Sequence, residues 1–240
     1  MKIDSPSNDK IKILSGSLLK LIAIITMLID HFALILNAEL GLSNILILTI
    51  FDRRVTLYYI LRKIGRLAFP IFCFLVAEGF FYTKNPIKYA AKLGVFALIS
   101  EIPFNLMLSG NIFYPNKQNV YVTLFLGVVL LFILTRGSNK IIQLLFSVLI
   151  ILIAGYARID YGIRGVLLIV LLFILRDKKN HQIVCSFPFL SGGYAAWCGI
   201  FLTLLYNNKR GFIKSPLLKY AFYVFYPAHI VILFLIKNFI

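Results

Sequence analysis

Three ionisable residues lie inside a long apolar stretch near the start of the chain. Lys20, Asp30 and His31 fall within LLKLIAIITMLIDHFALIL, residues 18–36, which is long enough to cross a bilayer as a helix. Because an ionisable side chain at membrane depth is costly, it normally faces a protein-lined cavity and marks function. A His beside a carboxylate is the smallest unit for general base catalysis. We interpret the stretch as a catalytic helix. The alternative is a Lys that reaches the membrane surface and a His that bonds a neighbouring helix.

The spacing of Lys20 and His31 places both residues on one face of that helix. The ten residues between them bring His31 back to within roughly 20° of Lys20, about 16 Å further along the axis. A Lys near the surface could hold an anionic ligand while the His acts on the far end of that ligand. Asp30 points about 100° away from His31. Glu78, Glu101 or His229 from another helix is therefore an alternative partner for the imidazole.

The composition excludes a soluble globular protein. Of the 240 residues, 60% are hydrophobic and only 14% are charged, whereas a soluble domain is about a quarter charged. The mean hydropathy is +0.90, and apolar runs recur along the chain between short basic or Gly-, Asn- and Pro-containing loops. We therefore predict one all-α domain over residues 1–240, a polytopic membrane helical bundle in contact with the lipid bilayer. Residues 1–14 are expected to form a short cytoplasmic segment.

The net charge of +16 does not indicate nucleic-acid binding, because the basic residues stand mainly between apolar runs. Orientation in the membrane and contact with anionic lipid headgroups account for most of them. The three cysteines lie in or beside apolar segments without metal-ligand spacing, and no metal site is expected. Basic residues divide almost evenly between the two sides of the predicted bundle, so the positive-inside rule does not choose an orientation.

Prolines next to acidic residues predict broken helices around a polar cavity. Pro70 shares an apolar run with Glu78, and Pro103 stands close to Glu101. Residues 45–63 mix apolar and basic residues and are interpreted as an interfacial or re-entrant element. We expect about eight spans, in a range of seven to ten: residues 18–36, 64–82, 93–108, 120–134, 140–154, 166–175, 182–206 and 220–236. The seventh of these is either one bent helix or a half-helix followed by a span.

Six blocks of the sequence resemble the TraX family of membrane proteins, in order from about residue 15 to the end of the chain. They are MLIDH (27–31), RKIGRLAFPIFCFLVAEGFFYT (62–83), LISEIPFN (98–105), DYGIRG (160–165), LLYNNKRG (204–211) and KYAFYVFYPAH (219–229). The family's namesake acetylates the N-terminus of conjugative pilin. The family is similar to a wider set of multi-helix acyltransferases, many of which carry a basic residue, ten further residues and a His on the first helix. Lys20 and His31 match that pattern.

The resemblance implies an acetyltransferase of the bacterial plasma membrane. Acetyl-CoA would be the acyl donor, and a peptide or pilin N-terminal amine, or a surface glycan, would be the acceptor. In this interpretation His31 is the base or a transient acyl carrier, with acidic residues that orient the imidazole or the acceptor: Asp30, Glu78 and Glu101. Cations would hold the CoA phosphates: Lys20, Arg62 and Arg66. The remaining cavity residues would be Asp160, Tyr226 and His229.

Two functions of other classes are compatible with the same residues. Proton-coupled transporters also place acids and histidines on broken helices near the middle of the membrane. No pair of matching halves is visible in the sequence, which disfavours a transporter. A scaffold without activity would leave the intramembrane charges without a purpose. Dependence on acetyl-CoA separates the acyltransferase from both alternatives.

Overall fold

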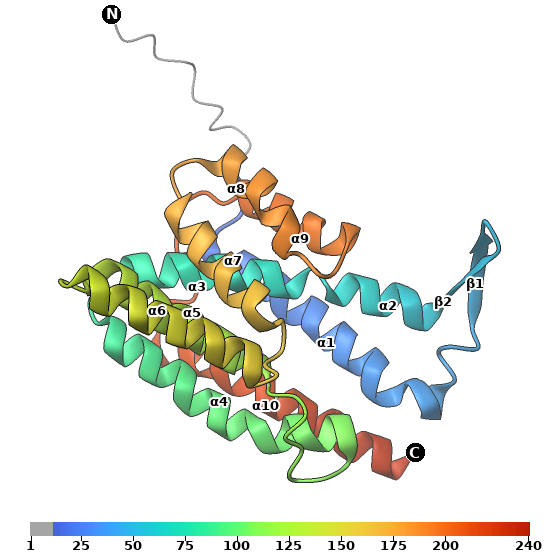
Figure 1. The fold of residues 1–240 in the computed structure, drawn as a ribbon. Coiled ribbons are helices and arrows are strands. Elements are labelled where there is room, and N and C mark those ends of the chain that lie inside the picture. Colours follow the sequence, from blue (N-terminus) through green and yellow to red (C-terminus); the bar gives the residue numbers. More distant parts are fainter. Residues whose placement is uncertain (1–11) are drawn as a thin grey trace, which may run out of the picture.

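The computed structural model describes residues 12–240 as a bundle of helices with one small β-hairpin at its edge (Figure 1). This confirms the predicted all-α membrane bundle. The expected N-terminal segment, residues 1–14, lies almost entirely outside the described residues. The elements are α1 (Gly16–Leu40), β1 (Leu46–Ile50), β2 (Arg53–Thr56), α2 (Leu57–Gly65), α3 (Ala68–Tyr82), α4 (Pro86–Ser109), α5 (Val120–Arg136), α6 (Lys140–Tyr156), α7 (Gly162–Ile174), α8 (Lys179–Ser186), η2 (Phe187–Phe189), α9 (Tyr194–Leu204) and α10 (Pro216–Phe239).

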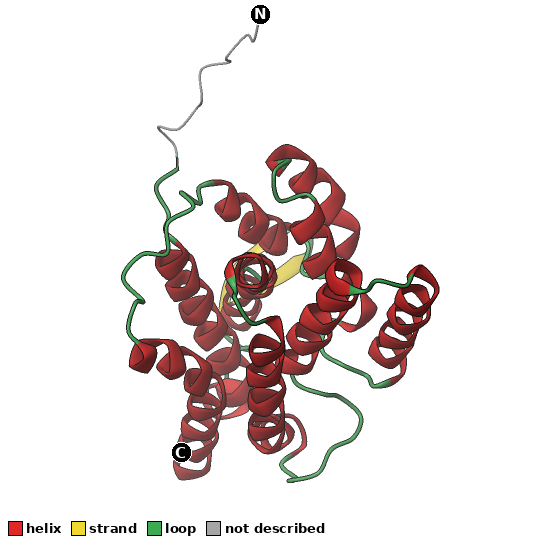
Figure 2. Ribbon diagram, turned by 90° about the vertical axis from the view of Figure 1, so that its left-hand side faces the viewer, coloured by secondary structure: helices red, strands yellow, loops and turns green. Residues whose placement is uncertain are grey.

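Within residues 12–240, four helical segments are long and apolar enough to cross a membrane: α1, α4, α10 and α2 together with α3. The shorter apolar helices are α5, α6, α7 and α9. Helix α3 lies in the middle, where Figure 2 shows it end-on, and it packs against α1, α5, α7 and α9. Its Ile71 and Phe74 side chains are buried in the core. Helix α6, by contrast, exposes Leu145, Leu149 and other large apolar side chains, which suits a surface that faces lipid.

The break between α2 and α3 follows from Pro70. Proline has no N–H to donate to the carbonyl four residues earlier, which belongs to Arg66. The helix is interrupted at Arg66 and Leu67, and Pro70 then stands in the first turn of α3, where an N–H would have no helical partner. The expected break at Pro103 is not found, because α4 runs through it. Two short helices thus form one span, and the break lies inside it.

Residues 45–63, predicted to be one interfacial or re-entrant element, divide into a β-hairpin and the first part of a membrane-spanning helix, and the interfacial position of the hairpin stays a prediction. Leu46–Ile50 and Arg53–Thr56 pair as an antiparallel hairpin, whose tip residue Phe51 has a left-handed backbone with φ 44°. The run ILILTI, which is rich in the β-branched residues Ile and Thr, favours a strand over a helix. Leu57–Gly65 is the first part of the span completed by α3. Arg62 is therefore carried into the bundle rather than held at its edge.

The segment at residues 182–206 enters the bundle and returns to the same end. Helix α8 leads in, the chain turns at Gly192 and Gly193, and the 11-residue α9 leads back. Lys179 Nζ, at the start, lies 3.4 Å from the carbonyl oxygen of Tyr206, at the finish. At the turn, a Cβ on Gly192 would meet the side chain of Arg66, near the middle of the α2–α3 span. The predicted half-helix is therefore present, but the span expected to follow it within residues 182–206 is replaced by a second short helix, so neither predicted alternative is correct as a whole.

This half-helix pair changes the distribution of charge. We call the end at which α1 and α10 begin and α3 ends the basic end; Figure 2 looks onto it. The loop after α9 returns there, where Gly16 N–H donates to the Lys209 carbonyl. Most basic residues of the described chain now lie at this end: Lys84, Lys88, Lys92, Arg136, Lys140, Arg176, Lys178, Lys179, Lys209, Arg210, Lys214 and Lys219. The even division predicted from the sequence was wrong because it counted residues 182–206 as a full crossing.

Candidate functional site

Two histidines from the ends of the chain form a hydrogen-bonded pair. His31 Nδ1 on α1 lies 2.6 Å from His229 Nε2 on α10, and the rings are nearly parallel. His229 Nδ1 lies 2.6 Å from the Phe225 carbonyl oxygen. A carbonyl oxygen only accepts, so His229 Nδ1 carries the proton and His229 Nε2 accepts from His31 Nδ1–H. In the neutral pair, this relay leaves His31 Nε2 with a free lone pair.

The relay holds His31 in one orientation at the edge of a cavity. His229 is only 4% exposed, with the Phe225 ring stacked on it 4.8 Å away between centroids. Tyr226 contacts His31 edge-on, with 5.9 Å between ring centroids. His31 itself is half-buried and lines a cavity of about 100 Å³, which we call the inner cavity. The imidazole of His31, with one nitrogen outside the relay, therefore lines a small cavity.

Five charged residues line the inner cavity together with His31: Asp30, Arg62, Arg66, Lys117 and Asp160. Arg62 Nη1 lies 2.5 Å from Asp30 Oδ2, and Lys117 Nζ lies 3.0 Å from Asp160 Oδ1. Gly65 permits the first of these pairs, because a Cβ there would overlap the Asp30 side chain. Asp30 thus joins α1 to α2, and His229 is the hydrogen-bond partner of the His31 imidazole.

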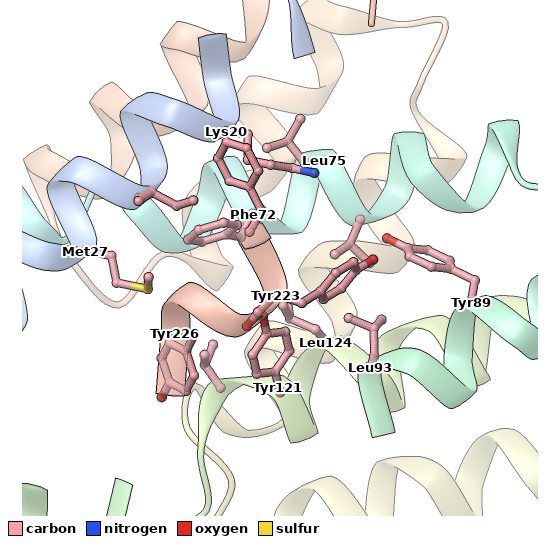
Figure 3. Close-up of a pocket in the computed structure, with 14 residues that line it drawn as sticks. Lys20, Met27, Phe72, Leu75, Tyr89, Leu93, Tyr121, Leu124, Tyr223 and Tyr226 are labelled. Atoms are coloured by element: carbon pink, nitrogen blue, oxygen red, sulfur yellow. Dashed lines mark hydrogen bonds between the residues drawn. The ribbon is translucent and has the colours of Figure 1, made fainter. Parts of the chain in front are cut away.

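A second cavity, which we call the aromatic passage, adjoins the inner cavity along α1. It has a volume of about 80 Å³ and shares Met27, Phe72 and Tyr226 with the inner cavity. Figure 3 shows Lys20 at one end of this passage and Tyr226 at the other. Lys20 and His31 therefore line adjoining cavities on one side of α1, as their spacing predicts.

A proline inside α10 also affects the hydrogen bonding of the residues that line the aromatic passage. Pro227 lies inside α10 and cannot donate to the carbonyl of Tyr223 four residues earlier. The hydroxyl of Tyr121 on α5 donates to that carbonyl at 3.1 Å. The carbonyl released by a proline thus finds a side-chain partner, and the contact fixes two of the tyrosines in Figure 3.

At the basic end the passage adjoins two larger cavities, of about 500 and 580 Å³, which we call together the basic vestibule. The two share Glu78 and Asn208, and Lys20 lines both the vestibule and the passage. Further basic residues line the vestibule: Lys12, Arg176, Lys178, Lys179, Arg210 and Lys219. Burial and the charge of Lys12 lower the pKa of Lys179, and burial and the nearby Glu78 raise the pKa of Tyr206 to about 12.

The structure separates the acidic residues that the sequence grouped together. Glu78 lies in the vestibule, where its Oε1 is 2.8 Å from Arg176 Nε, and not beside His31. Glu101 accepts from the amide of Asn119 at 2.6 Å. Because Asn119 caps α5, this contact joins Glu101 on α4 to the start of α5. Glu101 lines none of the cavities described above in residues 12–240. Of the predicted acids, only Asp30 and Asp160 reach the inner cavity.

The predicted phosphate-binding cations are also divided. Arg62 and Arg66 line the inner cavity with His31, whereas Lys20 lies at the vestibule. The cations that accompany Lys20 are Arg210 and Lys219. Arg210 lies within the block LLYNNKRG quoted above, but one sequence gives no signal that the loop folds back onto α1. Among the described residues, no group of three or more His, Cys, Asp or Glu side chains is placed to hold a metal ion.

Comparisons with known proteins identify one family and two relatives. The model of the family described as TraX protein matches residues 15–237. The chain is 29% identical over 248 residues to the probable fimbrial assembly protein FimC, serogroup H1, of Dichelobacter nodosus, covering 92% of this chain and 95% of that protein. It is 28% identical over 174 residues to the uncharacterized protein RP591 of Rickettsia prowazekii (strain Madrid E), covering 71% and 59%. No solved structure matches the chain.

Proposed function

The chain belongs to the TraX protein family, and from this membership we propose that it is a membrane-embedded acyltransferase. It transfers an acetyl group from acetyl-CoA to an acceptor at the membrane, either an N-terminal amine of a peptide or pilin, or a surface glycan. A relative named as a probable fimbrial assembly protein favours the pilin-like acceptor. The observation that carries the proposal is the His31–His229 relay, which lies beyond a passage that begins at Lys20 and the basic vestibule.

The vestibule supports the donor end of this proposal. Lys20, Arg210 and Lys219 surround one of its cavities, and cations are the natural partners of phosphate groups. Lys20 stands where the vestibule meets the passage, so the acyl-carrying arm of the donor would follow α1 for about 16 Å towards His31. The apolar and aromatic lining of the passage matches an uncharged arm better than a phosphate.

The relay supports general base catalysis by His31. As the acceptor nitrogen or oxygen attacks the thioester carbonyl, its proton passes to His31 Nε2. The tetrahedral adduct then expels the CoA thiolate with cleavage of the C–S bond, and the thiolate takes the proton from His31. The products are the acetylated acceptor and CoA. His229 is a positioning residue, because its Nε2 accepts from His31 Nδ1–H in both the neutral and the protonated state of His31.

The distribution of charge supports an orientation. Cytoplasmic ends of membrane proteins carry an excess of Lys and Arg, so the basic end faces the cytoplasm in this proposal. Acetyl-CoA would enter the vestibule from there, in the plasma membrane of a bacterium. His31 lies further along α1 from the basic end, and the acetyl group would be passed towards the opposite leaflet.

The test is turnover by purified protein in lipid nanodiscs. We expect acetyl-CoA to stabilise the wild type against heat and to be converted slowly to CoA. His31→Gln should keep the stabilisation and lose the conversion. Phe32→Ala, a change in the neighbouring residue that points out of the bundle, is the matched control and should convert acetyl-CoA normally. Folded wild type that is neither stabilised by acetyl-CoA nor converts it would exclude the acyltransferase and favour the transporter.

A further inference from the structure

One cation of the inner cavity has no anionic partner. The cavity holds three cations, Arg62, Arg66 and Lys117, against the two carboxylates of Asp30 and Asp160. Arg62 takes Asp30, and Lys117 takes Asp160. Within residues 12–240, no carboxylate lies within ion-pair distance of Arg66. Asp30 and Asp160 act on Arg66 only from beyond ion-pair distance, so Arg66 is the cavity cation that has no direct anionic contact.

Arg66 is held firmly although its charge is unpaired. It stands at the break between α2 and α3, and its stem packs against Gly192, where any larger residue would collide with it. Its guanidinium interacts with the Tyr161 hydroxyl. The Tyr161 ring is stacked on Phe69, with 3.4 Å between centroids and 2° between planes. The side chain is thus supported by three elements of the fold rather than extended into solvent.

An unpaired guanidinium inside a membrane bundle is costly and is a site for an anion. Arginine binds carboxylate and phosphate through two parallel N–H donors. The phosphates of the donor do not match Arg66 by position, because the vestibule cations lie at the other end of the passage. The thioester that reaches His31 is uncharged. The anion that belongs at Arg66 is therefore part of the second substrate.

We propose that Arg66 anchors an anionic group of the acyl acceptor, which is thus an amine or hydroxyl compound with a nearby carboxylate or phosphate. The identification of this ligand as the acyl acceptor rests on the proposed function, whereas the anion site at Arg66 does not. Since the inner cavity has only about 100 Å³, the anionic group and the reacting atom are separated by a few bonds. An acidic residue near a peptide N-terminus, an acidic sugar and a phospholipid headgroup share this chemistry.

The deciding experiment measures binding without acetyl-CoA, so that it does not depend on acyl transfer. Protein in phosphatidylcholine nanodiscs is titrated by calorimetry with two pairs of probes that differ by one anionic group. The pairs are phosphoethanolamine with ethanolamine, and β-alanine with β-alaninamide. We expect the wild type to bind the anionic member of each pair about tenfold more tightly, as a charge-assisted bidentate contact requires. Arg66→Gln should abolish this preference, and Arg66→Lys should retain part of it.

Controls distinguish this site from a general effect of charge. Arg54→Gln, on the exposed hairpin, should leave the preference unchanged. Arg66→Gln should bind acetyl-CoA as tightly as the wild type does, which also shows that it is folded. A fall in acetyl-CoA affinity would place Arg66 at the donor phosphates and overturn the proposal. Equal binding of charged and neutral probes by the wild type would overturn it without any variant.

Two further arms identify the source of the anion and separate this inference from the proposed function. Phosphatidylethanolamine in the nanodisc will compete with phosphoethanolamine if the acceptor is a lipid, and will not compete if it is water-soluble. Both results retain Arg66 as the anchor. If no acetyl-CoA is consumed but the probe preference depends on Arg66, the enzyme assignment fails and the anion site stands. If CoA is released but the wild type shows no preference for the anionic probes, the enzyme assignment stands and the anion site at Arg66 fails.

Discussion

Replacement of His229 tests whether the relay fixes the protonation of His31. The Phe225 carbonyl obliges His229 to present a lone pair to His31 Nδ1–H across 2.6 Å. His229→Phe keeps a ring in the stack but removes the acceptor, so that His31 loses the preference for protonation at Nδ1. His229→Gln can place its amide oxygen near the position of Nε2 and accept the same hydrogen bond. The two variants therefore separate packing from hydrogen bonding.

The expected loss is set by the contribution of a correctly protonated general base, about 10²–10⁴-fold in rate. For His229→Phe we expect a reduction in kcat of about 10²-fold or more, which corresponds to about 2.7 kcal/mol of transition-state stabilisation. The KM for acetyl-CoA should change little, because Lys20 and the vestibule lie at the other end of the passage. His229→Gln should recover most of the lost rate.

The assay is steady-state release of CoA thiol by protein in nanodiscs over a range of acetyl-CoA concentrations, so that kcat and KM are obtained separately. Thermal stabilisation by acetyl-CoA shows that each variant is folded. The reasoning is refuted if folded His229→Phe matches His229→Gln in rate, since the hydrogen bond would then have no role. It is also refuted if both variants raise KM and leave kcat unchanged, because His229 would then act in binding.

Three further predictions follow from single contacts. Gly65→Ala should force α2 away from Asp30 and lower the free energy of unfolding by about 1–3 kcal/mol through overpacking. Scanning fluorimetry should show a lower melting temperature, and an unchanged melting temperature would contradict the close approach of Gly65 to Asp30. Tyr121→Phe should leave the released Tyr223 carbonyl without its donor, at a cost of about 1–3 kcal/mol, and should lower the melting temperature by about 2–4 °C per kcal/mol. The pKa of Lys179 is lowered by burial and by Lys12, so its positive charge disappears at a lower pH than that of an ordinary lysine. Affinity for acetyl-CoA should therefore fall as pH rises from 7 to 10 in the wild type and should fall less in Lys179→Arg, as titration calorimetry can measure; parallel curves would exclude Lys179 from phosphate binding.

Most features that depend on one helix alone were predicted from the sequence, the expected break at Pro103 being the exception. The common face of Lys20 and His31 follows from the helical period, and the break near Pro70 follows from the missing N–H. The membrane class follows from hydropathy. The prediction that the Asp30 side chain points away from His31 also needs only one helix, since neighbouring positions on a helix diverge by about 100°. None of these inferences needs a contact between elements.

Features that depend on packing between distant elements were not predictable from one chain. His229 is 198 residues from His31, and nothing local distinguishes it from Glu78 or Glu101 as a partner for the imidazole. Residues 182–206 have the length and hydropathy of a span, and only contacts between distant residues, Gly192 with Arg66 and Lys179 with Tyr206, show that the chain turns back. That single error also concealed the charge asymmetry, because it moved the following basic loop to the wrong end.

The pattern of paired and unpaired charges inside the bundle indicates where anionic ligands bind. The four carboxylates that reach the cavities are all in ion pairs: Asp30 with Arg62, Asp160 with Lys117, and Glu78 and Asp177 both with Arg176. In residues 12–240, three cations of these cavities remain outside such pairs while projecting from the long membrane helices: Lys20 and Lys219 at the vestibule, and Arg66 at the inner cavity. A fold that needed cations only for stability would pair them. Their positions on either side of the aromatic passage instead match two anionic ligands that approach the His31 relay from opposite ends, one as donor and one as acceptor.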